Sequence, residues 1–163
     1  MRQADRRTQG GALTDVLPGL RASSGYLLYR LGAESRRLWA RMLAERDLTP
    51  HHFGVLSALD QLGVTHQQRL SELVGIDPRN AVPVVDLLRR RGLIERAPDP
   101  ADRRRHAIQL TAAGRAVCAD LRSAGDTIEA ELLDGLDGRE RTALHRLLLK
   151  LLEETQSRAT RSR

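Results

Sequence analysis

Apolar residues recur every three or four positions over much of the chain, a spacing typical of helices that bury one face. The first such segment runs from Ser24 to about Ala44, with apolar residues at Leu27, Leu28, Leu31, Leu38, Trp39 and Met42. A second begins at Thr49-Pro50, where threonine can cap a helix and proline fits its first position. It ends near Leu62, and its predicted buried stripe is Phe53, Leu56 and Leu59.

Two short helices follow in close succession. Thr65 to Gln68 has the form of a capping box, and Leu70, Leu73 and Val74 are the predicted inward face of a helix that ends at Gly75. Asp77-Pro78 begins the next helix, which runs to Arg91 before Gly92 supplies a left-handed C-cap. Two short capped helices joined by a tight turn indicate a helix-turn-helix.

The apolar period changes to two after Gly92, which predicts strands. Residues 93–96 form one predicted strand and residues 106–110 another, with Ile108 and Leu110 on one face. Between them, residues 98–105 are rich in turn-forming and charged residues. The pattern predicts a β-hairpin wing.

Two longer helices complete the chain. Thr111 caps a helix that extends to about Leu133, with a stripe formed by Val117, Leu121, Ala124, Ile128 and Leu132. Asp137 to Glu140 is a second capping box, and it opens a last helix whose inner side carries Leu144, Leu147, Leu148, Leu151 and Leu152.

The predicted fold is mainly α with a small β-hairpin wing (α+β), a winged helix-turn-helix with N- and C-terminal dimerisation helices. Residues 1–22 form a flexible arm, 23–47 and 111–155 the helical dimerisation region, 48–110 the DNA-binding region and 156–163 a polar tail. Residues 65–110 cannot cover all the apolar stripes, and each buried leucine is worth roughly 1.5 to 3 kcal/mol. A two-fold homodimer is therefore expected, with packing inside one subunit as the alternative.

The net positive charge alone does not indicate a nucleic-acid partner, and the positions of the arginines along the chain must decide. The formal net charge is +6, and Lys150 is the one lysine among 27 basic residues. Arginine suits contact with phosphate and guanine, although a G+C-rich coding sequence would produce the same bias. The single cysteine excludes an intrachain disulfide, and no stretch has signal-peptide or transmembrane character. We expect a cytoplasmic protein without a membrane partner.

The helix after Asp77 is the predicted DNA-reading element. With Ala81, Val84, Val85 and Leu88 inward, the step of about 100° per residue puts Arg79, Pro83, Asp86 and Arg90 outward, with Val82 beside them. Arg79 could bond guanine, Asn80 adenine or phosphate, and Val82 a thymine methyl group. An ordinary solvated face is the alternative. The predicted DNA contacts are Gln67, Arg69, Arg79, Asn80, Val82, Pro83, Arg90, Arg103, Arg104 and Arg105.

Two features of this region have specific consequences. Pro83 has no N–H, so the Arg79 carbonyl loses its helical donor, and we hypothesise that the resulting kink fits the helix to the groove. At the hairpin tip, arginine can enter a narrow minor groove, and Asp102 can pair with Arg104 and fix its direction. Arg89, Arg90 and Arg91 are more ambiguous candidates for phosphate contact, and of these Arg90 is included among the predicted DNA contacts.

The order of elements and three motifs resemble the multiple-antibiotic-resistance regulator (MarR) family of bacterial transcription factors. The similarity runs from about Leu28 to Leu152, through LTPHHFGVL at 48–56, LLRRRGLIER at 87–96 and, most specifically, DPADRRRHAIQLTAAGR at 99–115. The resemblance implies homodimers on palindromic operators in double-stranded DNA, usually repressing. Release is usually by a small, often phenolic or lipophilic, ligand or by thiol oxidation. Asp102 and Arg104 match the family's wing-tip acid and minor-groove arginine.

Two departures limit the resemblance. Arg79-Asn80 and Pro83 stand where many members have small hydroxyl residues and a helix former, so the operator cannot be inferred. No cysteine lies near the start of the first helix, where the peroxide-sensing branch has its thiol. Cys118 is interpreted as a buried structural thiol rather than a redox sensor.

The resemblance places a ligand pocket between the dimer helices and the reading head. The candidates are Tyr26, Tyr29, Arg30, His51, His52 and Phe53, although Phe53 could be core and the histidines could cap the helix or face water. Because the two histidines are adjacent, a metal site is not expected, and neither is a cofactor. The sequence contains no phosphate-binding loop, nucleophile elbow or H-E-x-x-H motif, so we do not expect an enzyme. An activator or dual regulator, or a winged-helix protein-interaction module, are the alternative functions.

Overall fold

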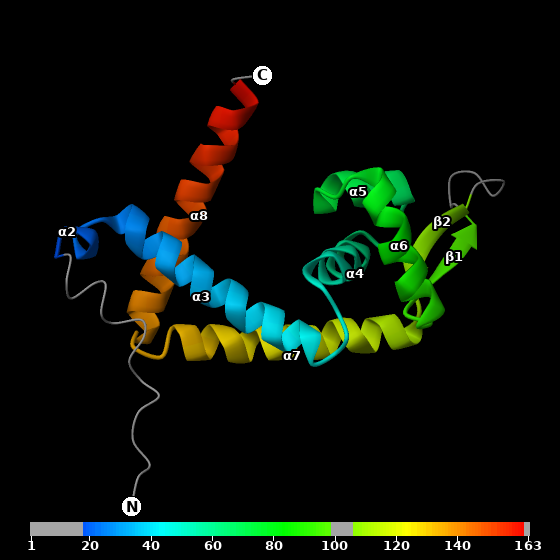
Figure 1. The fold of residues 1–163 in the computed structure, drawn as a ribbon, viewed down its shortest axis with the longest axis horizontal. Coiled ribbons are helices and arrows are strands. Elements are labelled where there is room, and N and C mark those ends of the chain that lie inside the picture. Colours follow the sequence, from blue (N-terminus) through cyan, green and yellow to red (C-terminus); the bar gives the residue numbers. More distant parts are fainter. Residues whose placement is uncertain (1–17, 99–105, 162–163) are drawn as a thin grey trace, which may run out of the picture. The chain divides into compact units, whose positions relative to one another are not determined.

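The computed structural model describes residues 18–98 and 106–161. The chain divides into two compact units, residues 1–122 and 123–163. Figure 1 shows the elements, which are α2 (Pro18–Arg21), α3 (Ser24–Ala44), α4 (Pro50–Leu62), α5 (Gln67–Val74), α6 (Pro78–Arg90), β1 (Ile94–Pro98), β2 (His106–Leu110), α7 (Ala112–Leu132) and α8 (Gly138–Arg161). The boundary between the units falls within α7. The mainly helical fold with one small hairpin is the predicted one.

The predicted helix caps form at four helices. At α4 the Thr49 N–H donates to His52 Nδ1 at 3.0 Å and the His52 N–H donates to Thr49 Oγ1 at 3.4 Å. Asp77 Oδ1 accepts the Arg79 N–H at 2.8 Å, and Thr111 Oγ1 accepts the Gly114 N–H at 3.0 Å. At α8, Asp137 and Glu140 exchange the reciprocal bonds of a capping box. These caps satisfy donors that the helices leave unpaired.

The capping box predicted at Thr65 is wrong. Helix α5 begins at Gln67 with His66 as its N-cap, and no side chain caps it. The Thr65 backbone is extended instead, since its N–H donates to the Ile108 carbonyl at 3.0 Å and its carbonyl accepts the Ile108 N–H at 2.7 Å. This isolated bridge ties the start of the helix-turn-helix to the hairpin.

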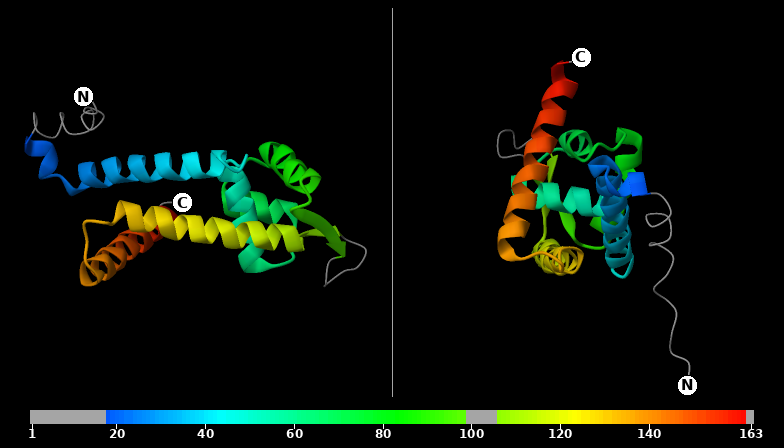
Figure 2. Two further views of the ribbon diagram at one scale, coloured as in Figure 1. Left: turned by 90° about the horizontal axis from the view of Figure 1, so that it is seen from below. Right: turned by 90° about the vertical axis from the view of Figure 1, so that its left-hand side faces the viewer.

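The hairpin pairs β1 with β2 antiparallel, from Ile94 opposite Leu110 to Pro98 opposite His106. It leads directly from α6 into α7 (Figure 2). The first strand begins one residue later than predicted, because the Leu93 N–H closes the end of α6 on the Leu88 carbonyl. Gly92, with φ of 67°, makes this left-handed turn.

The core of the first unit is formed by leucines from α3, α4, α5, α6 and α7. Its fully buried members include Leu43, Leu56, Leu59, Leu70, Leu88 and Leu121. Two glycines allow close approach of neighbouring elements: a Cβ at Gly54 would lie 2.5 Å from Val74 Cγ1, and one at Gly114 would overlap the Leu93 carbonyl oxygen. The Val74 side chain of α5 therefore packs directly on the α4 backbone at Gly54, and the start of α7 packs on the backbone of Leu93, just before β1.

Several sequence expectations differ from the structure. Leu73 was predicted inward but is 46% exposed, because α5 turns Ser71 to the core instead. The Ser71 hydroxyl donates to the Gln67 carbonyl one turn back, which allows a polar residue to be buried there. Pro18–Arg21 of the predicted arm form α2, and α8 continues past Thr155 to Arg161 through residues without proline or glycine.

Apolar side chains remain exposed on α3 and α8, two of the three helices of the predicted dimerisation region. On α3 these are Leu27, Leu28, Tyr29 and Leu31, and on α8 they are Leu147, Leu148, Leu149, Leu151 and Leu152. None of the described helices is both long and apolar enough to cross a membrane. Within residues 18–98 and 106–161, no group of three or more histidine, cysteine, aspartate or glutamate residues could hold a metal ion.

Candidate DNA-binding surface

Helix α6 separates its side chains as predicted. Ala81, Val84, Val85 and Leu88 are buried, and Arg79, Asn80, Val82, Pro83 and Arg90 are exposed. Val82 is 47% exposed, so an apolar side chain faces solvent among polar ones. The outward face can offer donors to base edges and phosphates together with an apolar contact for a methyl group.

The turn before α6 fixes where its first residues lie. Gly75, with φ of 66°, ends α5 in the left-handed conformation, and the buried Ile76 donates its N–H to the Ser71 carbonyl. Asp77 then caps α6 through the Arg79 N–H, so Arg79 projects from the first turn of the helix. This is the turn that enters the major groove in a helix-turn-helix.

Pro83 lies inside α6 without ending it, since the helix continues to Arg90. The Pro83 ring lies on the exposed side of the helix, where it displaces no core residue. The backbone group affected by the missing N–H is the carbonyl of Arg79, the residue predicted to contact guanine.

The arginines at the end of α6 have three different environments. Arg89 pairs with Asp86, with 3.3 Å between Nη2 and Oδ1. Arg90 is exposed. Arg91 donates from Nη1 to the Asp47 carbonyl at 2.9 Å and from Nη2 to the Arg46 carbonyl at 3.1 Å. The sequence alone could not distinguish Arg91 from Arg89 and Arg90, because the carbonyl partners of Arg91 are more than 40 residues away along the chain.

Helix α5 carries Gln67 and Arg69, two of the predicted DNA contacts. Arg69 is exposed, but its Nη1 lies 3.4 Å from Glu72 Oε2 on the same helix. Gln67 is half-buried at the first turn of the helix. With Asp86, Arg89 and Arg96, Gln67 lines a hollow of about 250 Å³ between α6 and the hairpin.

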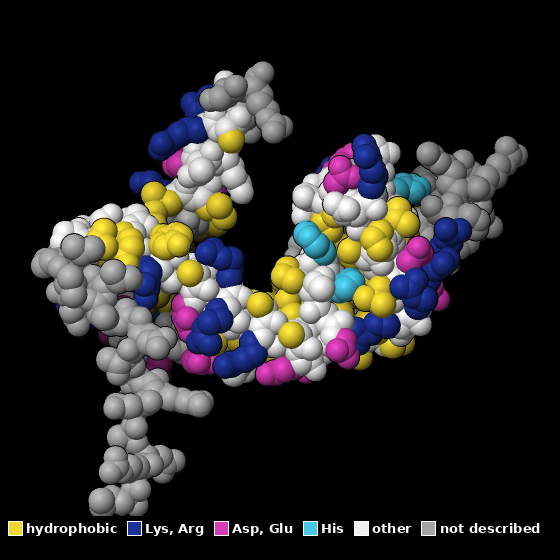
Figure 3. Space-filling view, in the orientation of Figure 1, with side chains coloured by type: hydrophobic (Ala, Val, Ile, Leu, Met, Phe, Trp, Pro, Cys, Tyr) yellow, Lys and Arg dark blue, Asp and Glu magenta, His cyan; other side chains and the backbone are white. Residues whose placement is uncertain are grey.

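Strands β1 and β2 of the hairpin lie beside α6, since residues of both strands line the same hollow. Arg96 is exposed on β1, and Gln109 Nε2 donates to Glu95 Oε1 at 2.9 Å across the hairpin. Arginine side chains gather on the part of the first unit that carries the end of α6 and the hairpin (Figure 3). The predicted tip residues Asp102, Arg103, Arg104 and Arg105 lie outside the described residues.

A sequence model of the MarR family matches residues 48–106, the segment from α4 to the second wing strand. The multiple antibiotic resistance protein MarR of Salmonella typhimurium is 30% identical over 129 residues, which are 78% of this chain and 90% of that protein. The chain belongs to the MarR family of transcriptional regulators. The transcriptional repressor NicR of Pseudomonas putida is a further relative, 26% identical over 82% of this chain and 84% of its own length.

Solved structures of MarR-family proteins share the fold. Wild-type MarR from Escherichia coli in its apo form superposes with a TM-score of 0.69 at 27% identity, covering 80% of this chain and 96% of its own. BpsR of Bordetella bronchiseptica, described as regulated in DNA binding by 6-hydroxynicotinic acid, superposes with a TM-score of 0.63 at 29% identity, covering 79% and 92%.

The six candidate effector residues of this MarR-family chain fall into two groups. Tyr26 and Tyr29 lie near the start of α3, with ring centroids 6.4 Å apart, next to Arg30. Phe53 packs on Trp39 instead, at 4.9 Å between centroids. Since a helix rises about 1.5 Å per residue, Tyr29 and Trp39 are about 15 Å apart along α3. One chain alone does not bring the two groups together.

The two histidines also differ. His51 is exposed, whereas His52 is buried and its Nδ1 is engaged in the cap of α4. Burial lowers the pKa of His52, and the neighbouring charges of Arg91 and His51 lower it further. The interpretation of His52 as a helix cap therefore accounts for its contacts, and His51 is the more accessible candidate for a ligand.

Cys118 is buried, and its thiol contacts the Leu56 carbonyl, with 3.7 Å between Sγ and the oxygen. Burial raises the pKa of Cys118. Because the thiolate is the reactive form, this environment disfavours oxidation.

Proposed function

We propose that this MarR-family chain is a homodimeric repressor that binds a palindromic operator in duplex DNA and releases it when a small molecule binds. The observation that carries the proposal is the outward face of α6, where Arg79, Asn80, Val82 and Arg90 are all exposed on a helix whose other face is buried. A chromosomal target would place the protein in the bacterial cytoplasm, on the nucleoid when bound.

The proposed contacts follow from the chemistry of each side chain. Arg79 binds guanine O6 and N7, Asn80 binds adenine or a phosphate, and Val82 touches a thymine methyl group. Arg90 neutralises phosphate. At the wing tip, Arg104 enters the minor groove with Asp102 as its support, and Arg103 and Arg105 meet phosphates.

Exposed leucines support the homodimer. Leu27, Leu28 and Leu31 on α3 and five leucines between positions 147 and 152 on α8 lie in solvent in the single chain. Each is 41 to 56% exposed, so burying the rest would contribute roughly half of the 1.5 to 3 kcal/mol of full burial, and a second copy of the chain is the natural cover. A two-fold dimer presents a pair of α6 helices, which matches a palindrome with half-sites about one helical turn apart.

Relatives support a repressor with an organic effector. NicR is named as a repressor, and BpsR is regulated by an aromatic acid. We propose a small phenolic or lipophilic effector, with Tyr26, Tyr29 and Arg30 as one set of contacts and His51, His52 and Phe53 as the other. A site that uses both sets needs a second chain to join them.

The decisive test is selection of duplexes from a random library, followed by titration of the selected duplex at increasing salt. Binding of Z phosphates should give a log–log slope of about −0.9Z. A flat response would refute DNA binding and favour a protein-interaction module. Sedimentation at micromolar concentration tests the dimer, and transcription from a template carrying the selected site separates repression from activation.

Two substitutions test the assigned contacts. Arg104→Ala should weaken binding to all duplexes, whereas Arg79→Ala should relax preference at one base position in each half-site, a discrimination of about 1 to 3 kcal/mol. Arg139→Ala is the charge-matched control, because it removes one exposed arginine from the second unit. Unchanged preference in Arg79→Ala would refute its assigned role.

A further inference from the structure

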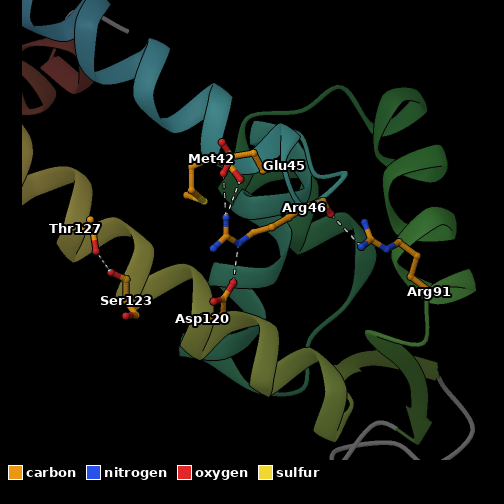
Figure 4. Close-up of polar contacts among 7 residues, drawn as sticks. All are labelled: Met42, Glu45, Arg46, Arg91, Asp120, Ser123 and Thr127. Carbon is orange, nitrogen blue, oxygen red and sulfur yellow. Dashed lines mark hydrogen bonds and ion pairs between the residues drawn. The ribbon is translucent and has the colours of Figure 1, made fainter.

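Arg46, just after α3, is bonded in two directions. Its Nε donates to Asp120 Oδ2 on α7 at 2.7 Å, and its Nη1 donates to the Met42 carbonyl at 3.1 Å. Its own carbonyl accepts a hydrogen bond from Arg91 Nη2 at 3.1 Å (Figure 4). Arg91 is the C-cap of α6. One residue is thus bound to α7 through its side chain and to the end of α6 through its backbone.

The backbone around Arg46 holds the two acceptors of Arg91 in place. The N–H groups of Arg46 and Leu48 both donate to the Leu43 carbonyl, at 3.0 and 2.9 Å, and Asp47 adopts a φ of 52°. Leu48 is buried. This tight turn presents the carbonyls of two consecutive residues to one guanidinium, whose planar fork suits paired acceptors.

The bond between Arg46 and Asp120 is charged on both sides. The hydrogen bond to Asp120 raises the pKa of Arg46, and the same bond lowers the pKa of Asp120. The Asp120 side chain is 59% exposed, and ion pairs at the surface contribute little to stability. A small stability gain does not explain this placement, whereas a geometric role does.

We propose that Arg46 is a positioning residue for the DNA-reading helix, because it couples α7 through Asp120 to the C-terminal end of α6 through Arg91. The inference rests on the proposed function, which assigns base contact to α6. That helix has 13 residues and is therefore about 20 Å long. A tilt of about 3° at its C-terminal end moves the first turn by about 1 Å, which is enough to spoil a hydrogen bond.

A second ion pair supplies a matched control. Arg122, two residues after Asp120 on α7, pairs with Asp60 on α4. Both pairs join α7 to the rest of the first unit, and both are partly exposed. Among the described contacts, the Arg122 pair does not involve Arg91 or the turn that holds it. Loss of the Arg122 pair should therefore not alter α6.

The experiment compares full-length Asp120→Asn, Arg46→Met, Arg91→Met and the control Arg122→Gln. The probe is a labelled duplex selected by the wild-type chain, with an unrelated duplex of equal length as reference. Asp120→Asn and Arg91→Met should each weaken binding of the selected duplex about threefold or more. The double variant Asp120→Asn/Arg91→Met should bind no more weakly than whichever single variant binds more weakly, because both changes break the same connection between α7 and α6. Arg122→Gln and Arg91→Met should instead combine multiplicatively.

Amide hydrogen exchange of the free protein gives a readout that does not involve DNA. Exchange at residues 88–93 should quicken in Asp120→Asn and Arg46→Met but not in Arg122→Gln. The proposal is overturned if Asp120→Asn behaves like Arg122→Gln in exchange, or if Asp120→Asn and Arg91→Met multiply in binding. Should the wild-type chain select no duplex, the proposed function fails while exchange still decides the coupling. If Arg46→Met does not fold, Asp120→Asn carries the test.

Discussion

Replacing Gly114 by alanine should destabilise the protein, although alanine is the better helix former. Gly114 lies in the first turn of α7, where an added Cβ would overlap the Leu93 carbonyl oxygen and lie 3.0 Å from its carbon and 3.1 Å from Leu110 Cδ2. That carbonyl also accepts the Thr111 N–H at 3.1 Å. It belongs to the backbone, so it cannot rotate away from the new methyl group.

The magnitude follows from two opposed contributions. Glycine to alanine within a helix gains about 0.5 to 1 kcal/mol from propensity. Overpacking costs about 1 to 3 kcal/mol, and we place this site at the upper end because the obstacle is backbone. The expected net loss is about 2 kcal/mol. With a urea dependence of about 1 to 3 kcal/mol per molar, the midpoint falls by about 1 M.

Urea unfolding at one fixed protein concentration measures this loss, since association would otherwise shift the midpoint. Ala116→Gly is the matched control, because Ala116 is exposed in the same helix and its change removes the same methyl group that Gly114→Ala adds. The control should lose about 0.5 to 1 kcal/mol by propensity alone. A Gly114→Ala protein as stable as wild type would refute the close approach of α7 to the wing.

The pKa of His52 lies below its ordinary 6.5 because of burial and the charge of Arg91, so the unfolded chain binds the proton more readily. Stability should be full above pH 6.5 and fall as the pH drops toward the folded pKa. His52→Gln, which keeps a capping acceptor, should remove this acid-linked loss, and an unchanged pH profile would contradict the assignment. Pro83→Ala should restore a donor for the Arg79 carbonyl and change affinity or site preference, and identical selection by both proteins would exclude a role for the kink. Gly54→Ala should destabilise the packing of α4 on α5 and be partly rescued by Val74→Ala; failure of the rescue would point away from the 2.5 Å contact.

Local chemistry made much of the fold predictable. Thr49, Asp77, Thr111 and Asp137 cap the helices that follow them, because a cap depends on residues within one turn. The inward and outward faces of α6 also follow from helical periodicity alone. Helix α6 and its exposed residues could therefore be predicted from the sequence.

Contacts between distant segments were not accessible in the same way. Thr65 has the composition of a cap, but pairing with Ile108 uses its backbone, and that partner is far along the chain. Arg89, Arg90 and Arg91 are identical in type, and only the tertiary fold gives Arg91 two carbonyl partners. Leu73 is exposed because the hydroxyl of Ser71 finds an acceptor on its own helix.

The pairing of Thr65 with Ile108 bears on how binding preference could diverge among related proteins. Because this bridge fastens the hairpin to the segment just ahead of α5, main-chain atoms hold the hairpin and the start of α5 together. Related proteins would then acquire new operator preferences by substituting exposed side chains, and not by changing the distance between the hairpin and the helix-turn-helix. If α6 reads DNA as proposed, positions 79, 80 and 82 could vary while the placement of the hairpin against the start of α5 stays the same.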